Sequence, residues 1–488
     1  MFTTILFKEL RGVFLSPKFI VTFSLCSVLM LLSVYVGIEH HRAAMEQFQA
    51  SMQLNDENMH EATNWGSFAA RSFRVPDPME IFVAGVNNDI GKVSSISEFN
   101  PVKLKGSVYS DETIYALFRM IDFSFIVQII LSLFAVLFTF DAINGEKENG
   151  TLQLTFANPV PRVSYILGKL LGGWIGLLLP LLIPVLLGVL LVMLLKVPMS
   201  ASDWLRFGVM LSVALCYFSF FVACGLLTSV LTKRSGVSFL LSLVLWVVFV
   251  LIIPRAGVMA AGQLIAVPSD AEIDGQRDAY AKDKWAHHMD VMTDHFAARE
   301  GLTRGMSQAD RTAYNEAHEW EWIQQEDSLR KQMQKEIEDH SEKLGEELRN
   351  KKVLQEKLGF SLSRTSPAAS FQLAMMQIAG TDVGLKSRYE DAMKQYREDF
   401  VGYVQKKQKE SGQTGGFRIT MDTQTGIKFT APRDGTSLDF TDAPVFTPPK
   451  VSLADILTPV AGDCGLLVLF TVLAFGGAMV RFLKYDLR

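Results

Sequence analysis

Long apolar runs constrain the fold of this chain more than any other feature of its sequence. A membrane hydrocarbon core about 30 Å thick is crossed by a helix of roughly 20 apolar residues. Six segments meet or approach that requirement, at residues 18–38, 123–140, 168–195, 207–231, 236–253 and 465–483. We therefore predict a mainly α, polytopic membrane protein with six transmembrane helices and a large, mostly helical extracytoplasmic domain.

The composition excludes several classes of protein. Charged residues make up 20% of the chain, below the roughly one quarter that is usual in soluble proteins. The formal net charge is only −4, so nothing indicates a nucleic-acid partner. The four cysteines lie in or beside apolar runs, so no disulfide framework is implied.

The distribution of Lys and Arg in the short connections predicts the orientation, because basic residues favour the cytoplasmic side of a membrane. One side collects Lys8, Lys147 and Lys484 among others, whereas the only short connection on the other side carries just two basic residues. We expect a multi-pass protein of a bacterial cytoplasmic (inner) membrane with both termini cytoplasmic. Residues 39–122 and 254–463 are then extracytoplasmic.

The predicted spans contain very few ionisable residues. Asp122 and Asp141 lie at the two ends of the second span, and Gln128 is its main internal polar residue. Ion-coupled carriers usually keep buried acidic or basic groups near mid-membrane. Their scarcity argues against an ion-driven carrier, so the energy for any transport is expected from another source.

The longest cytoplasmic connection, residues 141–167, is polar and rich in Gly and Pro although apolar spans flank it. An Asn-Gly pair predicts a turn after the second span, and residues 151–156 predict a short amphipathic helix. The two prolines that follow end this helix, because the residue before a proline is pushed out of helical geometry. A new helix is expected to begin near Ser164. We expect a stiff cytoplasmic element that transmits force from a docked partner to the two spans it joins.

The stretch EKENGTLQLTFANPVPR, followed by VSYILGKLLGG, resembles the cytoplasmic loop of type-2 ABC transporter permeases, which are exporter membrane subunits that work with a separate ATPase. The matching residues are Glu146, Lys147, Glu148, Gly150, Thr151, Pro161, Arg162, Gly168 and Lys169. The resemblance implies a coupling helix seated in a groove of the ATPase. It assigns ATPase coupling to Glu146, Lys147, Glu148, Asn149, Gly150, Thr151, Leu152, Pro159, Pro161 and Arg162. The alternative is an ordinary connector whose Gly and Pro residues only make turns.

Two outer stretches look like those of a subgroup of these permeases with large extracytoplasmic insertions. They are RVPDPMEIFVAGVNNDIG at residues 74–91 and SPAASFQLAMMQIAGTD at residues 366–382. The resemblance therefore extends from the six spans to parts of the outer segments.

Residues 1–17 and the third span carry signals for helix packing. Residues 1–17 place apolar and polar side chains on opposite helical faces, which predicts an interfacial helix on the inner leaflet. A plain cytoplasmic lead-in is the alternative. Gly168, Gly172 and Gly176 recur at a four-residue spacing. Small residues at that spacing let helices approach closely.

No nucleotide site is recognised in the sequence. The nearest approach to a phosphate-binding loop, GVNNDIGKVS at residues 85–94, has one residue too many between its glycines. It also carries Val93 where a Ser or Thr should bind magnesium. We therefore expect no cofactor bound by this chain, with ATP and Mg on a partner ATPase.

One cluster of potential metal ligands is present, comprising His287, His288, Asp290, Asp294 and His295. Two of these histidines are two turns apart on a helix and share a face, so the cluster could ligate a metal. A solvated polar face is the favoured interpretation, and no metal site is predicted. No nucleophile–base arrangement is found either, so the chain itself is not expected to be an enzyme.

The segment 254–463 is expected to contain long helices and a hairpin. An apolar stripe that includes Met333 and Ile337 runs along a long charged helix and requires a partner helix. A later amphipathic helix that includes Tyr389 could supply that partner. Residues 417–430 alternate as in a β-hairpin.

Together these features predict a permease subunit that couples ATP hydrolysis by a separate ATPase to substrate export or to movement of its extracytoplasmic domain. The expected partners are a cytoplasmic ABC ATPase, a second permease in a homodimer or heterodimer, membrane lipids and an extracytoplasmic protein. The alternative is a non-transporting membrane scaffold or sensor whose outer domain binds a partner. A membrane enzyme is disfavoured because a catalytic constellation was not found.

Overall fold

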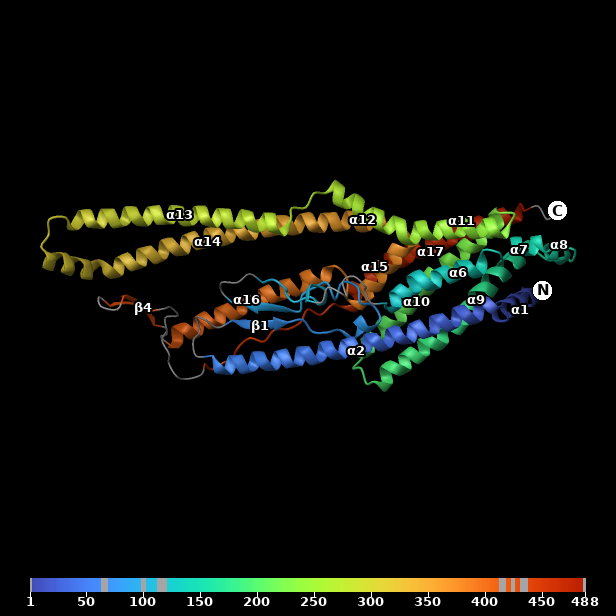
Figure 1. The fold of residues 1–488 in the computed structure, drawn as a ribbon, viewed down its shortest axis with the longest axis horizontal. Coiled ribbons are helices and arrows are strands. Elements are labelled where there is room, and N and C mark those ends of the chain that lie inside the picture. Colours follow the sequence, from blue (N-terminus) through green and yellow to red (C-terminus); the bar gives the residue numbers. More distant parts are fainter. Residues whose placement is uncertain are drawn as a thin grey trace. The chain divides into compact units, whose positions relative to one another are not determined.

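The computed structural model describes residues 2–62, 69–97, 102–111, 121–411, 418–422, 426–430 and 438–485. The chain divides into two compact units, which Figure 1 traces element by element. The first unit comprises residues 1–252 and 366–488, and the second comprises residues 253–365. The predicted outer segment 254–463 is therefore divided between the two units.

Six helices in the described part of the chain are long and apolar enough to cross a membrane. Four are single helices: α2 (Pro17–Glu61), α9 (Arg162–Leu194), α10 (Ala201–Leu231) and α17 (Leu453–Leu483). The second span comprises α5 (Phe123–Phe125), the π-helical turn η2 (Ile126–Leu131), α6 (Ser132–Thr139) and α7 (Asn144–Glu148). The fifth comprises α11 (Ser235–Val247), the π-helical turn η3 (Val248–Ile252) and α12 (Ile253–Leu264). The prediction of a mainly α, polytopic membrane protein with six spanning helices is confirmed.

Local sequence signals explain where several of these helices begin. The Ser16 side chain accepts a hydrogen bond from the backbone N–H of Phe19 at the start of α2. Ser200 and Asp203 form a capping box at the start of α10. Such side chains satisfy backbone N–H groups that the first turn of a helix leaves without a partner. These polar caps therefore delimit helices whose interiors are almost entirely apolar.

Helix α10 lies at the centre of the bundle and packs against α6, α9, α11 and α17. Its Met210, Tyr217 and Phe221 side chains are fully buried. The short helix α15 (Pro367–Ala379) also packs against α10, and the Phe371 ring stacks on Tyr217 with ring centroids 4.4 Å apart. The core of the first unit therefore joins the spans to a segment from the end of the long insertion.

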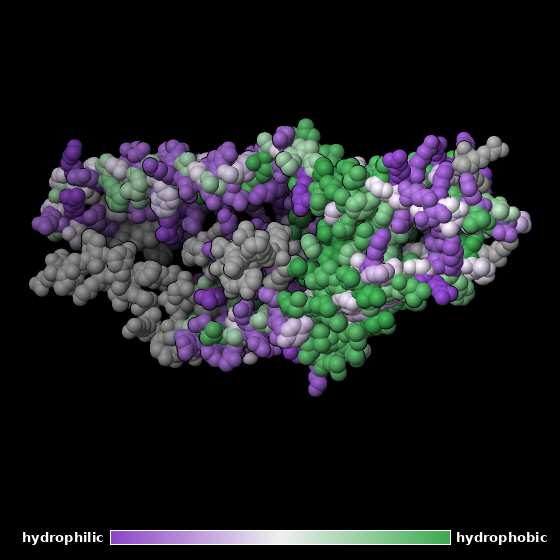
Figure 2. Space-filling view, turned by 45° about the vertical axis from the view of Figure 1, so that its right-hand side comes forward, coloured by the Kyte–Doolittle hydropathy of each residue, from purple (hydrophilic) through white to green (hydrophobic). Residues whose placement is uncertain are grey.

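The outer faces of the spanning helices remain apolar. Leu186 of α9, Leu240 of α11 and Leu473 of α17 are each more than half exposed. Figure 2 shows this surface as a green band of hydrophobic side chains. Exposed apolar surface of this extent is unfavourable in water and suits contact with lipid.

A small layer of strands and helices lies at the end of the first unit away from the two chain termini (Figure 1). Strand β1 (Ala70–Phe73) pairs antiparallel with β2 (Val93–Ile96), with Ala70 opposite Ile96. The 3-10 helix η1 (Pro78–Ile81) and α3 (Val108–Asp111) lie in the same part of the chain. Helix α16 (Gly384–Ser411) buries Tyr389, Met393 and Phe400 in one cluster with residues of both strands.

The predicted hairpin near the end of the insertion is confirmed. Strand β3 (Arg418–Asp422) pairs antiparallel with β4 (Gly426–Thr430), with Arg418 opposite Thr430.

The second unit is a helical hairpin in which α13 (Asp270–Thr303) packs against α14 (Gln308–Ser363). Ion pairs connect the helices, among them Lys284 Nζ 2.6 Å from Glu336 Oε2, Arg299 Nη1 2.7 Å from Glu326 Oε1 and Lys352 Nζ 2.9 Å from Asp270 Oδ1. Met333 of the predicted apolar stripe is buried. Helix α12 also packs against α14.

The sequence offered the helix containing Tyr389 as one candidate partner for the apolar stripe of α14, but α13 packs against α14. Helix α16 uses its apolar face against the β1–β2 layer, whereas α13 supplies the partner of α14. The physical reason is the very short connection between α13 and α14, because short connections favour antiparallel neighbouring helices.

Candidate functional site

The predicted coupling segment folds into two short helices, α7 and α8 (Thr151–Phe156), before α9 begins at Arg162. We call residues 141–161 the α7–α8 loop. Gly150, between the two helices, has φ of +72°, a left-handed conformation that glycine adopts without steric strain. This turn lets the chain change direction between α7 and α8. Figure 1 shows the loop at the same end of the first unit as α1 (Phe2–Phe14) and the C-terminus.

The first residue of α7, Asn144, is fully buried and fixes the loop to α10. Its side-chain amide donates to Thr232 Oγ1 over 3.0 Å, and its Oδ1 accepts from Ser229 Oγ over 3.2 Å. The backbone N–H groups of Ile143 and Asn144 both donate to Ser229 Oγ. Buried polar groups are stabilised when they are paired in this way, so α7 is held against the end of the fourth span.

Glu146 accepts hydrogen bonds from three side chains that are distant in the sequence. Lys8 Nζ of α1 lies 2.6 Å from Oε1, and Lys169 Nζ of α9 lies 2.7 Å from the same atom. The Tyr165 hydroxyl donates to Oε2 over 2.6 Å. Hydrogen bonds to an ionised carboxylate are stronger than neutral ones. Glu146 therefore joins the loop, the N-terminal helix and the third span.

Lys169 is the most buried charge of this arrangement, with 4% of its side chain exposed. Its ammonium group lies 2.7 Å from both Glu9 Oε1 and Glu146 Oε1. A buried cation is tolerated only when anions and acceptors surround it. The two carboxylates provide this environment, so α1 and α7 are both held to the start of α9.

The three glycines predicted to pack helices line the face of α9 that contacts α1. A Cβ atom placed on Gly168 would lie 2.8 Å from Ile5 Cγ2, and one on Gly172 would lie 2.5 Å from Glu9 Cβ. At Gly176 the corresponding distance to Val13 Cβ is 3.3 Å. Only small residues allow helices to approach this closely.

The last turn of α17 contacts the start of α9. Arg162 Nη1 donates to the backbone carbonyl oxygens of Leu483 over 2.6 Å and Tyr485 over 3.2 Å. A helix leaves its last carbonyl groups without partners, and a cationic side chain there is electrostatically favourable. Arg162 thus joins the third span to the sixth.

Two leucines of α8 lie in opposite environments. Leu152 is fully buried in an apolar cluster with Tyr165, Leu226 and Phe482. Leu154 is 71% exposed. Residues two positions apart in a helix point in nearly opposite directions, so the buried position of Leu152 turns Leu154 outward. The outward face of the loop also exposes Asn149, Gln153, Ala157, Asn158, Pro159 and Pro161.

Two further loop residues contact neighbouring elements. Glu148 accepts hydrogen bonds from the backbone N–H and the hydroxyl of Ser235 at the start of α11. A carboxylate is favoured at the N-terminus of a helix, where backbone N–H groups carry partial positive charge. Lys147 Nζ lies 4.7 Å from the centre of the Tyr485 ring. The loop therefore contacts α1, α9, α10, α11 and the residues that follow α17.

The residues assigned to ATPase coupling thus divide into two groups. One group contacts other parts of the same chain and comprises Glu146, Lys147, Glu148, Leu152 and Arg162. The other group is exposed and comprises Asn149, Thr151, Pro159 and Pro161. The sequence marked Asn144 only as part of a turn, whereas it begins helix α7, and did not single out Leu154. Their two-residue spacing in so short a helix was a signal that Leu152 and Leu154 point in different directions and that one of them is exposed.

The potential metal ligands predicted to form a solvated face lie on α13. Within the described part of the chain, no group of three or more His, Cys, Asp or Glu side chains is arranged to hold a metal ion. His288 instead packs edge-on against the Trp285 ring.

A family model described as an ABC-2 family transporter protein matches residues 3–487. None of the curated proteins compared with the chain matches it.

Proposed function

Because this chain belongs to the ABC-2 transporter family, as the match over residues 3–487 shows, we propose that it is the permease subunit of an ATP-driven export system of the bacterial inner membrane. In this proposal both termini and the α7–α8 loop are cytoplasmic. A separate ATPase, which binds ATP and Mg, docks on the outward face of the loop. The nucleotide cycle of the ATPase moves the spans that the loop contacts. The permease works as a homodimer or as a heterodimer with a related permease.

The division of the loop into an inward and an outward face is the observation that supports this proposal most. Glu146 and Asn144 fix α7 to α1, α9 and α10 through hydrogen bonds of 2.6–3.2 Å. Force applied to such a loop reaches several spanning helices at once, because packed interiors deform very little. An ordinary connector needs none of these long-range contacts.

The outward face has the character of a protein-binding surface. Leu154 presents an exposed apolar side chain, and polar and proline residues surround it. An apolar centre with a polar rim is typical of protein–protein interfaces. We therefore place the ATPase contact on Leu154 and its exposed neighbours, whereas Glu146, Leu152 and Arg162 stabilise the loop from within.

Replacement of Leu154 tests the docking surface directly. Leu154→Asp is expected to remove the ATPase that co-purifies with the chain from native membranes, since a charge would replace the apolar contact. Leu354→Asp is the matched control, because Leu354 is a similarly exposed leucine of α14 in the second unit, 57% exposed. Bound ATPase is measured as ATP hydrolysis in the purified sample and identified by mass spectrometry.

Both variants must reach the membrane in amounts equal to the native chain. Retention of the ATPase by Leu154→Asp would overturn the proposed docking surface. A native chain that purifies only with proteins of the outer surface would favour the membrane scaffold over the transporter subunit.

A further inference from the structure

A cavity of about 420 Å³ lies beside the outer half of α2, within the first unit. One wall is a face of α2 from Ser33 to Ser51, and the opposite wall comes from the segment between Phe73 and Val93. Cavities of this size are in the range of small-molecule sites. The cavity has no role in the proposed docking of an ATPase.

The acidic side chains of the wall already accept hydrogen bonds from the protein. Glu80 accepts from Asn87 Nδ2 and lies 2.9 Å from His41 Nδ1. Asp122 accepts from the backbone N–H groups of Phe125 over 2.8 Å and Ala84 over 3.0 Å. Both carboxylates are thus engaged in holding the walls of the cavity together.

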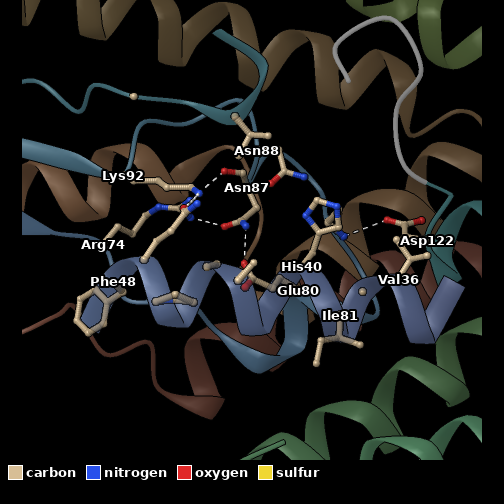
Figure 3. A pocket seen from close by; sticks show the side chains of 18 of the residues that line it. Val36, His40, Phe48, Arg74, Glu80, Ile81, Asn87, Asn88, Lys92 and Asp122 are labelled. Atoms are coloured by element: carbon tan, nitrogen blue, oxygen red, sulfur yellow. Dashed lines mark hydrogen bonds between the residues drawn. The ribbon is translucent and has the colours of Figure 1, made fainter. Parts of the chain in front are cut away.

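Two basic side chains, Arg74 and Lys92, line the same part of the cavity. Arg74 is 9% exposed and donates to both the side chain and the backbone carbonyl of Asn87. Its Nε is buried and has no partner among the described residues. Lys92 lies on the same side of the cavity, as Figure 3 shows, and its Nζ donates to Gln47 Oε1 over 3.3 Å. Burial lowers the pKa of Arg74, which Glu80 partly opposes, so an anion beside the guanidinium would compensate for lost hydration.

The two ends of the cavity carry different side chains. Arg74, Asn87 and Lys92 gather near the Phe48 end, whereas Val36 and Ile81 lie toward the other end together with His40 and Asp122 (Figure 3). Small residues on the α2 wall, such as Ala44, leave the space open. Because α2 is predicted to leave the membrane near residue 38, the Val36 end of the cavity is the one nearer to the lipid.

We propose that this cavity binds a single-chain anionic amphiphile derived from the membrane. Its acyl chain lies against Val36 and Ile81, and its carboxylate or phosphate headgroup contacts Arg74 and Lys92. The headgroup would lie beside the Arg74 guanidinium and the Lys92 ammonium group, which both line the cavity. The site is independent of the docking of an ATPase on the α7–α8 loop, so either proposal can fail without the other.

Binding of radiolabelled palmitate to the purified full chain in neutral-lipid nanodiscs tests this proposal. Palmitate is expected to bind saturably, and lysophosphatidylglycerol is expected to compete with it. Hexadecanol, which has the same chain without the charge, is expected to compete roughly tenfold less well, since a charge-assisted hydrogen bond is lost. Inorganic phosphate is expected not to compete.

Two variants test the headgroup contact and the space for the acyl chain separately. Lys92→Met is expected to weaken palmitate binding roughly tenfold, whereas Lys103→Met, at an exposed lysine outside the cavity, leaves binding unchanged. Ala44→Trp fills the cavity and should abolish binding. Thermal unfolding without ligand verifies that each variant is folded.

Equal competition by hexadecanol and lysophosphatidylglycerol would overturn the anionic specificity. Unchanged binding by Ala44→Trp would overturn the location. Competition by inorganic phosphate alone would show a site for a free anion rather than for an amphiphile.

Discussion

Lys169 and Glu146 illustrate how single residues stabilise the candidate site. The ammonium group of Lys169 is almost fully buried and lies between two carboxylates. The sequence identified both residues through the family resemblance but could not show what they contact. Glu146 pairs with Lys8, which lies 138 positions earlier in the chain, and no local pattern predicts a contact at that separation.

Glu146→Gln should lower the free energy of unfolding by on the order of 2 kcal/mol, because it leaves Lys169 buried with one anion instead of two. Thermal unfolding of the purified chain measures this loss. Glu148→Gln is the matched control, since this side chain is exposed and its amide oxygen can still accept one of the two hydrogen bonds that Ser235 donates. Equal melting temperatures for the two variants would contradict the stabilising role of Glu146.

At the scale of elements, the apolar runs predicted the spanning helices well. This signal is local, since a helix satisfies its backbone hydrogen bonds within one segment. The pairing of elements was less predictable. The stripe of α14 required a partner, but α13 and α16 both offered apolar positions, and only the tertiary structure shows that α13 supplies it.

The close contact of α1 with α9 provides a test at this scale. Gly172→Leu is expected to destabilise the chain by roughly 1–3 kcal/mol, since the new side chain would overlap Glu9 and separate the helices. Gly208→Leu in α10 is the control, because a Cβ atom there has no neighbour within 4 Å. The packing role of Gly172 would be rejected if thermal unfolding showed equal losses for both variants.

At the scale of the whole molecule, the α7–α8 loop contacts helices from the beginning, middle and end of the first unit. It contacts α1, α10 and the residues that follow α17. The sequence predicted this loop as the functional centre because it is polar and resembles a known family. Only the tertiary structure shows which side chains of the loop face outward, because Leu152 and Leu154 are the same type of residue and differ only in the direction in which they point.

The central claim is that the outward face of the α7–α8 loop is cytoplasmic and is covered by an ATPase. The most direct measurement is labelling of Leu154→Cys with a membrane-impermeant maleimide, in a chain whose four native cysteines are replaced by serine. The account predicts no labelling from outside intact cells. It predicts labelling in inverted vesicles stripped of the ATPase, and protection when the ATPase is present. Labelling from the outside, or labelling that the ATPase does not reduce, would contradict it.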